Sequence, residues 1–178
     1  MTFPLLAVLL TVATAAQAAA WSVTGSSVTF AVRNAGAVVD GKLGNLTADI
    51  AFDPAALEAS SIRATVDTAS VRTGIALRDR HLRSCDYFCA GQHPKILMES
   101  RGFEALGGDR YRGAFDLTIR GTKQRVEVPF TFRSDGATGR FSGEITIDRT
   151  HFGVGGKSMF VASDVAVRVD VNVKREAE

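Results

Sequence analysis

The sequence lacks the short motifs that usually identify catalytic or nucleic-acid-binding proteins. Its two cysteines are spaced C-x3-C, unlike the C-x-x-C of thioredoxin-like proteins and the paired C-x2-C of zinc sites. No serine lies in a G-x-S-x-G turn, and no glycine-rich phosphate loop opens a helix. The 21 lysines and arginines nearly balance the 19 acids, without the clustered basic surface of a nucleic-acid binder. These absences favour a protein that is not an enzyme and does not bind nucleic acid.

Long apolar runs are also missing. The run from Phe3 to about Ala13 is shorter than the roughly 20 residues that cross a bilayer, and A-x-A patterns follow at residues 16–18 and 18–20. We therefore predict a secretory signal peptide at residues 1–20 and one domain at residues 21–178, with a buried N-terminal helix as the alternative. Export predicts a periplasmic protein without stable membrane insertion, in a compartment that allows disulfides.

Apolar and polar residues alternate along most of the predicted domain. This period of two is typical of antiparallel strands with one buried face. It recurs at residues 27–33, 46–52, 62–68, 95–101, 111–121, 126–132, 141–148 and 164–174. Because each strand has a single apolar face, the sheet must close on itself or pair with a second sheet. About eight strands are typical of small ligand-holding barrels, so we predict an all-β domain of this kind.

The apolar faces of these strands combine large and small side chains. The rings are those of Phe30, Phe52, Phe115, Phe130, Phe132 and Phe141, and the small residues among them are Ala48, Ala64, Gly113 and Gly143. Such a mixture can line an elongated apolar cavity, because the small residues leave room that the rings border. The alternative is that the rings fill a solid core.

Residues 75–88 break the alternation and favour one short helical insertion. His81, Cys85, Cys89 and His93 follow one another at intervals of four, and they are residue types that bind zinc. On a continuous helix His81 and His93 would be roughly 18 Å apart, too far to share one ion, so we predict no metal site. Cysteines four apart on a helix are close enough for a disulfide, with two free thiols as the alternative. An exported metal- or redox-active protein that uses this cluster is the second interpretation of function.

Several stretches together are similar to the YceI-like lipid/polyisoprenoid-binding family. They include "SSVTFAVRNAG", "ADIAFDP", "ASVRTGIALRDRHLRSCDYF", "HPKILMES", "YRGAFDLTIRGTKQRVEVPFTF" and "IDRTHFGVGG". The resemblance runs from Trp21 to about Lys174 and implies an extended lipocalin-like antiparallel β-barrel without a cofactor. It implies a carrier that holds a long isoprenoid or similar amphiphilic lipid, and a homodimer is left open.

The resemblance also directs the choice of site residues. We expect the cavity to form a tunnel for the ligand, and we expect Phe88 to close one end of it. The predicted lining residues are Phe30, Phe52, Phe88, Met98, Phe115, Leu117, Phe130, Phe132 and Phe141. A polar head would meet Arg78 or His81. The chain departs from the usual family pattern at Asn34, where a histidine is common, at Leu43, where a phenylalanine is common, and at both cysteines.

Overall fold

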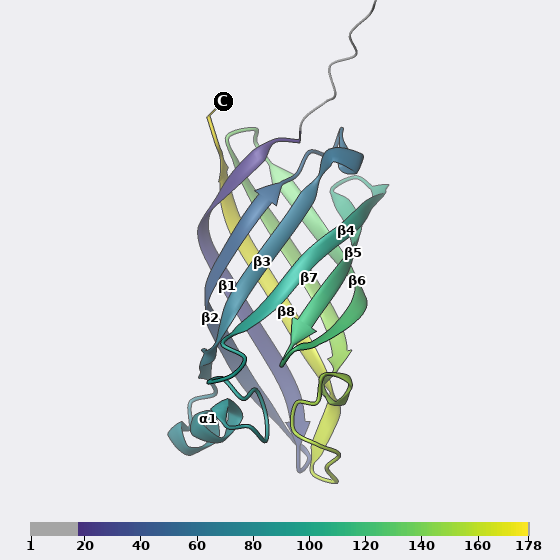
Figure 1. The fold of residues 1–178 in the computed structure, drawn as a ribbon. Helices are drawn as coiled ribbons and strands as arrows, with labels where there is room; N and C mark the ends of the chain where they lie inside the picture. The colour runs from purple at the N-terminus through teal and green to yellow at the C-terminus, as the bar shows by residue number, and fades with distance from the viewer. Residues whose placement is uncertain (1–17, 178) are drawn as a thin grey trace, which may run out of the picture.

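Eight antiparallel strands form a closed barrel in the computed structural model, which describes residues 18–177. The strands are β1 (Ala20–Asn34), β2 (Ala37–Ala51), β3 (Ser61–Arg72), β4 (Lys95–Gly107), β5 (Arg110–Ile119), β6 (Thr122–Ser134), β7 (Thr138–Asp148) and β8 (Val161–Arg175). Each strand pairs with its neighbours in the sequence, and β8 closes the barrel by pairing with β1 (Figure 1). The predicted all-β barrel with one helical insertion is confirmed.

The two ends of the barrel differ in how their strands are connected. At the upper end in Figure 1 lie tight hairpins, the 3-10 turn η1 (Leu57–Ala59) and the C-terminus. At the lower end lie the tight β1–β2 and β5–β6 turns and two longer connections. One of these contains α1 (Ala76–Arg83) between β3 and β4, and the other contains η2 (Arg149–Phe152) between β7 and β8. No helix in residues 18–177 is long and apolar enough to span a bilayer. All but the last three residues of the predicted signal peptide, residues 1–20, lie outside the described part.

The predicted helix at residues 75–88 is shorter than the sequence suggested. It ends at Arg83, because Ser84 takes an extended conformation and both its amide and its hydroxyl donate to the carbonyl of His81. Cys85 and Cys89 therefore lie in a turn after the helix, with their Cα atoms 3.8 Å apart, and a disulfide joins them. The premise that His81, Cys85, Cys89 and His93 lie on one continuous helix was therefore wrong.

A buried aspartate attaches α1 to the end of β3. The amide and hydroxyl of Thr73 donate to Oδ1 of Asp79 at 2.7 and 2.6 Å, and Asp79 is 5% exposed. These hydrogen bonds, the hydroxyl's first, lower the pKa of Asp79 below its usual value. Arg78 donates in turn from Nε and Nη2 to the hydroxyl and carbonyl of Thr73, both at 2.7 Å. The start of α1 is thereby held against the barrel.

Aromatic rings fill the upper end of the barrel. We call this cluster the aromatic plug; it comprises Trp21, Phe52, Phe103, Tyr111, Phe130, Phe132 and Phe141. Phe52 is 0% exposed and lies edge-on to five of the other rings, with centroids 5.1 to 5.7 Å apart. The indole of Trp21 donates to the carbonyl of Phe52 at 2.8 Å. The alternative of a solid core is therefore correct for the rings at this end of the barrel, and a smaller buried cluster of Ile119, Phe152 and Val154 packs at the lower end.

Candidate ligand-binding cavity

Below the aromatic plug the barrel interior is hollow. The cavity has a volume of about 370 Å³, within the range of roughly 300–1,000 Å³ that is typical of small-molecule sites. All eight strands contribute to its wall, because the alternation along each strand turns every second side chain inward. Val165, Val167, Val169 and Val171 of β8 form one continuous side of this wall.

The floor of the cavity combines small residues with the lower face of the aromatic plug. Ala48 of β2 and Ala64 of β3 are directly paired across the two strands, and both line the cavity. Ala48 also packs against the plug, and Phe130 and Phe141 belong to both the plug and the lining. The two alanines therefore leave space where larger side chains would extend the solid core downward.

Polar side chains of the lining gather at the lower end, with the exception of Thr65, whose hydroxyl contacts Thr47 on the outer surface. The members of this group are Asn34, Thr73, Arg78, His81, Tyr87 and Arg149. They come from the end of β1, from the connection that contains α1 and from η2, all at the lower end of the barrel (Figure 1). We call this region the mouth; the cavity is apolar in its depth and polar only there.

The two long connections are tied to each other beside the mouth. Arg149, 6% exposed, donates to five backbone carbonyls, three in the β7–β8 connection, including that of Val154 at 2.7 Å, and two at the start of β8, including that of Val161 at 2.9 Å. Arg120 donates to the carbonyls of Cys85 and Gly153, which lie on different connections. The mouth is thus framed by backbone that buried or partly buried arginines hold in place.

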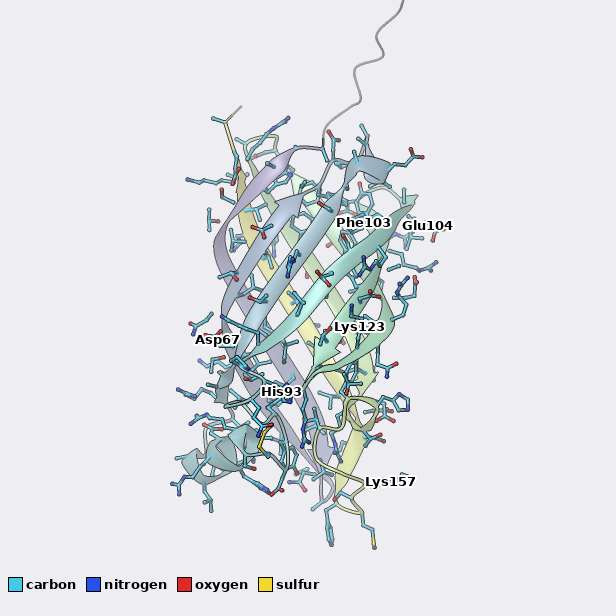
Figure 2. The ribbon with its side chains drawn as sticks, viewed as in Figure 1. Asp67, His93, Phe103, Glu104, Lys123 and Lys157 are labelled. Atoms are coloured by element: carbon cyan, nitrogen blue, oxygen red, sulfur yellow. A yellow bond between two sulfur atoms is a disulfide. The ribbon has the colours of Figure 1, made fainter. Side chains whose placement is uncertain are left out.

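The segment closed by the disulfide presents aromatic side chains to the cavity. Tyr87 and Phe88 lie between the bonded Cys85 and Cys89, and both contribute to the lining. The disulfide lies near His93 at the lower end of the barrel (Figure 2). Because the two sulfur atoms bind each other, neither is free to ligate a metal. Residues 18–177 contain no group of three or more histidine, cysteine or acidic side chains placed to hold an ion.

Most of the residues predicted to line the ligand do border the cavity: Phe30, Phe88, Met98, Phe115, Leu117, Phe130 and Phe141, together with Arg78 and His81. Phe52 and Phe132 do not, because both are buried in the aromatic plug, 0% and 5% exposed. Sequence reasoning missed Tyr87 and Arg149. Asn34 and Leu43, where the chain departs from the family pattern, both lie in the lining.

These features define a class of protein: a small antiparallel β-barrel with an apolar internal cavity that is closed by packed rings at one end and bordered by polar side chains at the other. Within that class, the chain belongs to the YceI-like domain family, whose model matches residues 21–176. A UPF0312 protein of Azotobacter vinelandii is 34% identical over 85 residues, which are 48% of this chain and 44% of that protein. The chain therefore spans less than half the length of that relative.

Solved structures show the same barrel. The crystal structure of BcnA from Burkholderia cenocepacia is 29% identical, with a TM-score of 0.78, over 83% of this chain and 95% of BcnA. A polyisoprenoid binding domain from Saccharophagus degradans, implicated in plant cell wall breakdown, superimposes with a TM-score of 0.67 over 90% of this chain and 100% of that domain. At 12% identity, the latter likeness concerns the fold alone.

Proposed function

We propose that the protein is a non-enzymatic carrier that holds the tail of a long isoprenoid or similar amphiphilic lipid inside the barrel. The observation that carries this proposal is the distribution of polar groups in the cavity, which is apolar from its floor at the aromatic plug down to the mouth and polar only at the mouth. An amphiphile has the same order of apolar and polar parts. The name of the Saccharophagus degradans domain is consistent with such a ligand.

The energetics favour a long tail. Burying one methylene group contributes about 0.8 kcal/mol, so each five-carbon isoprene unit contributes on the order of 3 kcal/mol before costs. Association loses roughly 4 to 15 kcal/mol of translational, rotational and ordering free energy, which several units together exceed. The affinity should therefore rise with the length of the tail until the cavity is full.

The polar head would remain at the mouth. Arg78 uses Nε and Nη2 to bind Thr73, which orients its guanidinium beside the cavity, and His81 lies one helical turn further along α1. Nε2 of His81 is 3.3 Å from a carboxylate oxygen of Asp86. A phosphate or hydroxyl head would find hydrogen-bond donors here, whereas the aliphatic wall above offers none.

The proposal includes the cellular setting. With residues 1–20 as a signal peptide, residues 21–178 would act in the periplasm, where a carrier of water-insoluble lipid has an aqueous space to bridge. The disulfide between Cys85 and Cys89 agrees with export, because such bonds persist in oxidising compartments.

Organic extraction of the purified protein followed by mass spectrometry tests the proposal. We expect a co-purifying lipid with a long apolar tail, and delipidated protein should bind prenyl alcohols with an affinity that increases with chain length. A matched pair of variants locates the site: Val167→Asp places a charge in the cavity wall and should abolish binding, whereas Arg168→Asp lies on the outer face of the same strand and should not. If no lipid is recovered and no prenyl chain binds, the proposal is wrong.

A further inference from the structure

The large apolar side chains that are exposed in residues 18–177 all lie at the lower end of the barrel. They are Val38 (57%), Ile75 (53%), Leu77 (70%), Met159 (97%) and Phe160 (69%). Val38 lies beside the β1–β2 turn, Ile75 and Leu77 at the start of α1, and Met159 and Phe160 in the β7–β8 connection, so three separate segments contribute. Scattered apolar residues on a surface need no explanation, but a set confined to one end indicates an interaction surface.

These three segments are adjacent around the mouth. The amide of Ala35 in the β1–β2 turn donates to the carbonyl of Phe160 at 2.7 Å, which joins that turn to the β7–β8 connection. On the other side, Asp40 of β2 and Ala76 of α1 line a common surface groove. Both connections and the turn lie at the same end in Figure 1. We call the five exposed apolar side chains, with the backbone that carries them, the mouth rim.

Basic side chains surround the mouth rim. Arg33, Lys42, Arg80 and Lys157 are exposed there and make no ion pair within the described part of the chain. Figure 2 shows Lys157 at the lower end of the molecule, beside the β7–β8 connection. Among the side chains at this end that are not buried, lysines and arginines outnumber acids: Arg33, Lys42, Arg72, Arg78, Arg80, Arg83, Arg120 and Lys157 against Asp40, Asp86, Asp148 and Asp164.

We propose that the mouth rim docks on an anionic lipid bilayer, with Met159 and Phe160 entering the interface and the surrounding basic side chains contacting the headgroups. Apolar side chains framed by lysine and arginine are the combination that binds such surfaces. The inference rests on the proposed function, because an apolar tail that enters or leaves through a mouth pressed to the bilayer avoids water. A second copy of the chain fits less well, since a two-fold interface here would bring the basic residues of both copies together.

Co-sedimentation with vesicles tests the docking directly. The probes are vesicles of phosphatidylcholine alone and vesicles of three parts phosphatidylcholine to one part phosphatidylglycerol. We expect binding to the anionic vesicles, and Met159→Ser with Phe160→Ser should weaken it roughly 100-fold, since each buried side chain accounts for about tenfold. Both side chains are exposed, so the fold should be unaffected.

A charge-matched pair of variants separates the two ends of the barrel. Arg33→Glu with Lys157→Glu should weaken vesicle binding at least about 25-fold, because each basic residue near an anionic surface contributes about fivefold. Arg110→Glu with Lys174→Glu makes the same change of charge on exposed residues of the upper end and should have little effect.

A short, water-soluble fluorescent prenyl probe, titrated without vesicles, keeps this inference separable from the proposed function. Vesicle binding that falls in the Met159 and Phe160 variant while probe binding is retained supports the docking surface. Two results overturn the docking surface without contradicting the carrier function. In the first, the wild-type protein binds the probe but does not bind anionic vesicles; in the second, vesicle binding is equal in all variants. Self-association that the Met159 and Phe160 variant abolishes, in the absence of vesicle binding, assigns the surface to a second copy and also overturns it.

Discussion

In the proposed carrier, the floor of the cavity should limit the length of tail that the barrel accepts. Ala48 lies on β2 opposite Ala64 of β3 and packs against the aromatic plug, whose rings are closely packed. Replacing Ala48 with leucine adds three carbons to the floor, and the plug has no space into which they can move. A tail that reaches the floor must therefore withdraw about three methylene groups, at about 0.8 kcal/mol each. The expected loss of about 2.4 kcal/mol corresponds to an affinity about 50-fold weaker.

This loss should depend on ligand length. We would titrate delipidated wild type and Ala48→Leu with prenyl alcohols that increase by one isoprene unit, using displacement of a fluorescent apolar probe as the readout. Alcohols too short to reach the floor should bind both proteins equally, and longer ones should lose affinity in the variant until the full effect is reached. Thr47→Leu is the matched control, since Thr47 is exposed and precedes Ala48 on the outer face of the same strand.

Two results would refute the reasoning. An equal loss for every length would mean that the variant distorts the barrel rather than shortening the cavity, which a lowered Tm would reveal. No loss at any length would mean that the tail does not extend to the plug.

Three further changes test other parts of the structure. Phe52→Ala should lower the free energy of unfolding by about 3 to 5 kcal/mol in a denaturant titration and admit longer tails, because it removes the central ring of the plug; an unchanged midpoint would contradict that packing. Cys85→Ser with Cys89→Ser should cost no more than about 2 kcal/mol, since the disulfide closes a short loop, and lipid binding should survive; a folded variant without any binding would show that the closed segment is essential. Because the pKa of Asp79 is lowered in the folded state, the stability that ionised Asp79 gives to the attachment of α1 is present above the unfolded-state pKa of about 3.9 and is lost as the pH falls through the folded-state value. Hydrogen exchange of α1, corrected for intrinsic rates, should therefore accelerate in acid, and it should accelerate less in Asp79→Asn. Equal acceleration in both proteins would count against the role of Asp79 in holding α1.

The strands and their inward faces could be predicted because a period of two depends only on which face is buried. The alternation along β8 predicts the valine side of the cavity, and the pattern around Phe30 and Phe115 predicts their inward direction. The period of two does not predict how far along the barrel axis an inward side chain lies. Phe52 and Phe132 show the same pattern as Phe30, yet they lie in the plug, since register and strand tilt decide which rings meet.

The mouth was harder to predict because irregular backbone positions its residues. The helical spacing of His81, Cys85 and Cys89 continues past the point where Ser84 ends α1, so a local hydrogen bond overrode the periodicity. In the sequence Arg149 is an ordinary basic residue after a strand, and only the folded β7–β8 connection together with the start of β8 gives its guanidinium five carbonyls to bind. The carbonyls that Arg149 binds do not follow a regular spacing in the sequence, so the alternation of apolar and polar residues does not predict them.

The closed upper end sets the direction in which the proposed cargo must move. Phe52 and the rings around it pack closely at the upper end, so the tail of the proposed cargo would enter through the mouth, ahead of its head. The head would then remain beside the polar side chains of Arg78 and His81, and release would follow the same path in reverse. Uptake and delivery would therefore both use the lower end of the barrel. Such a carrier would have to present this end first to the membrane that donates the cargo and then to the membrane that accepts it. Docking at the mouth rim would then be needed twice in each cycle, so the variant Met159→Ser with Phe160→Ser should slow transfer between two vesicle populations by more than it slows extraction from one.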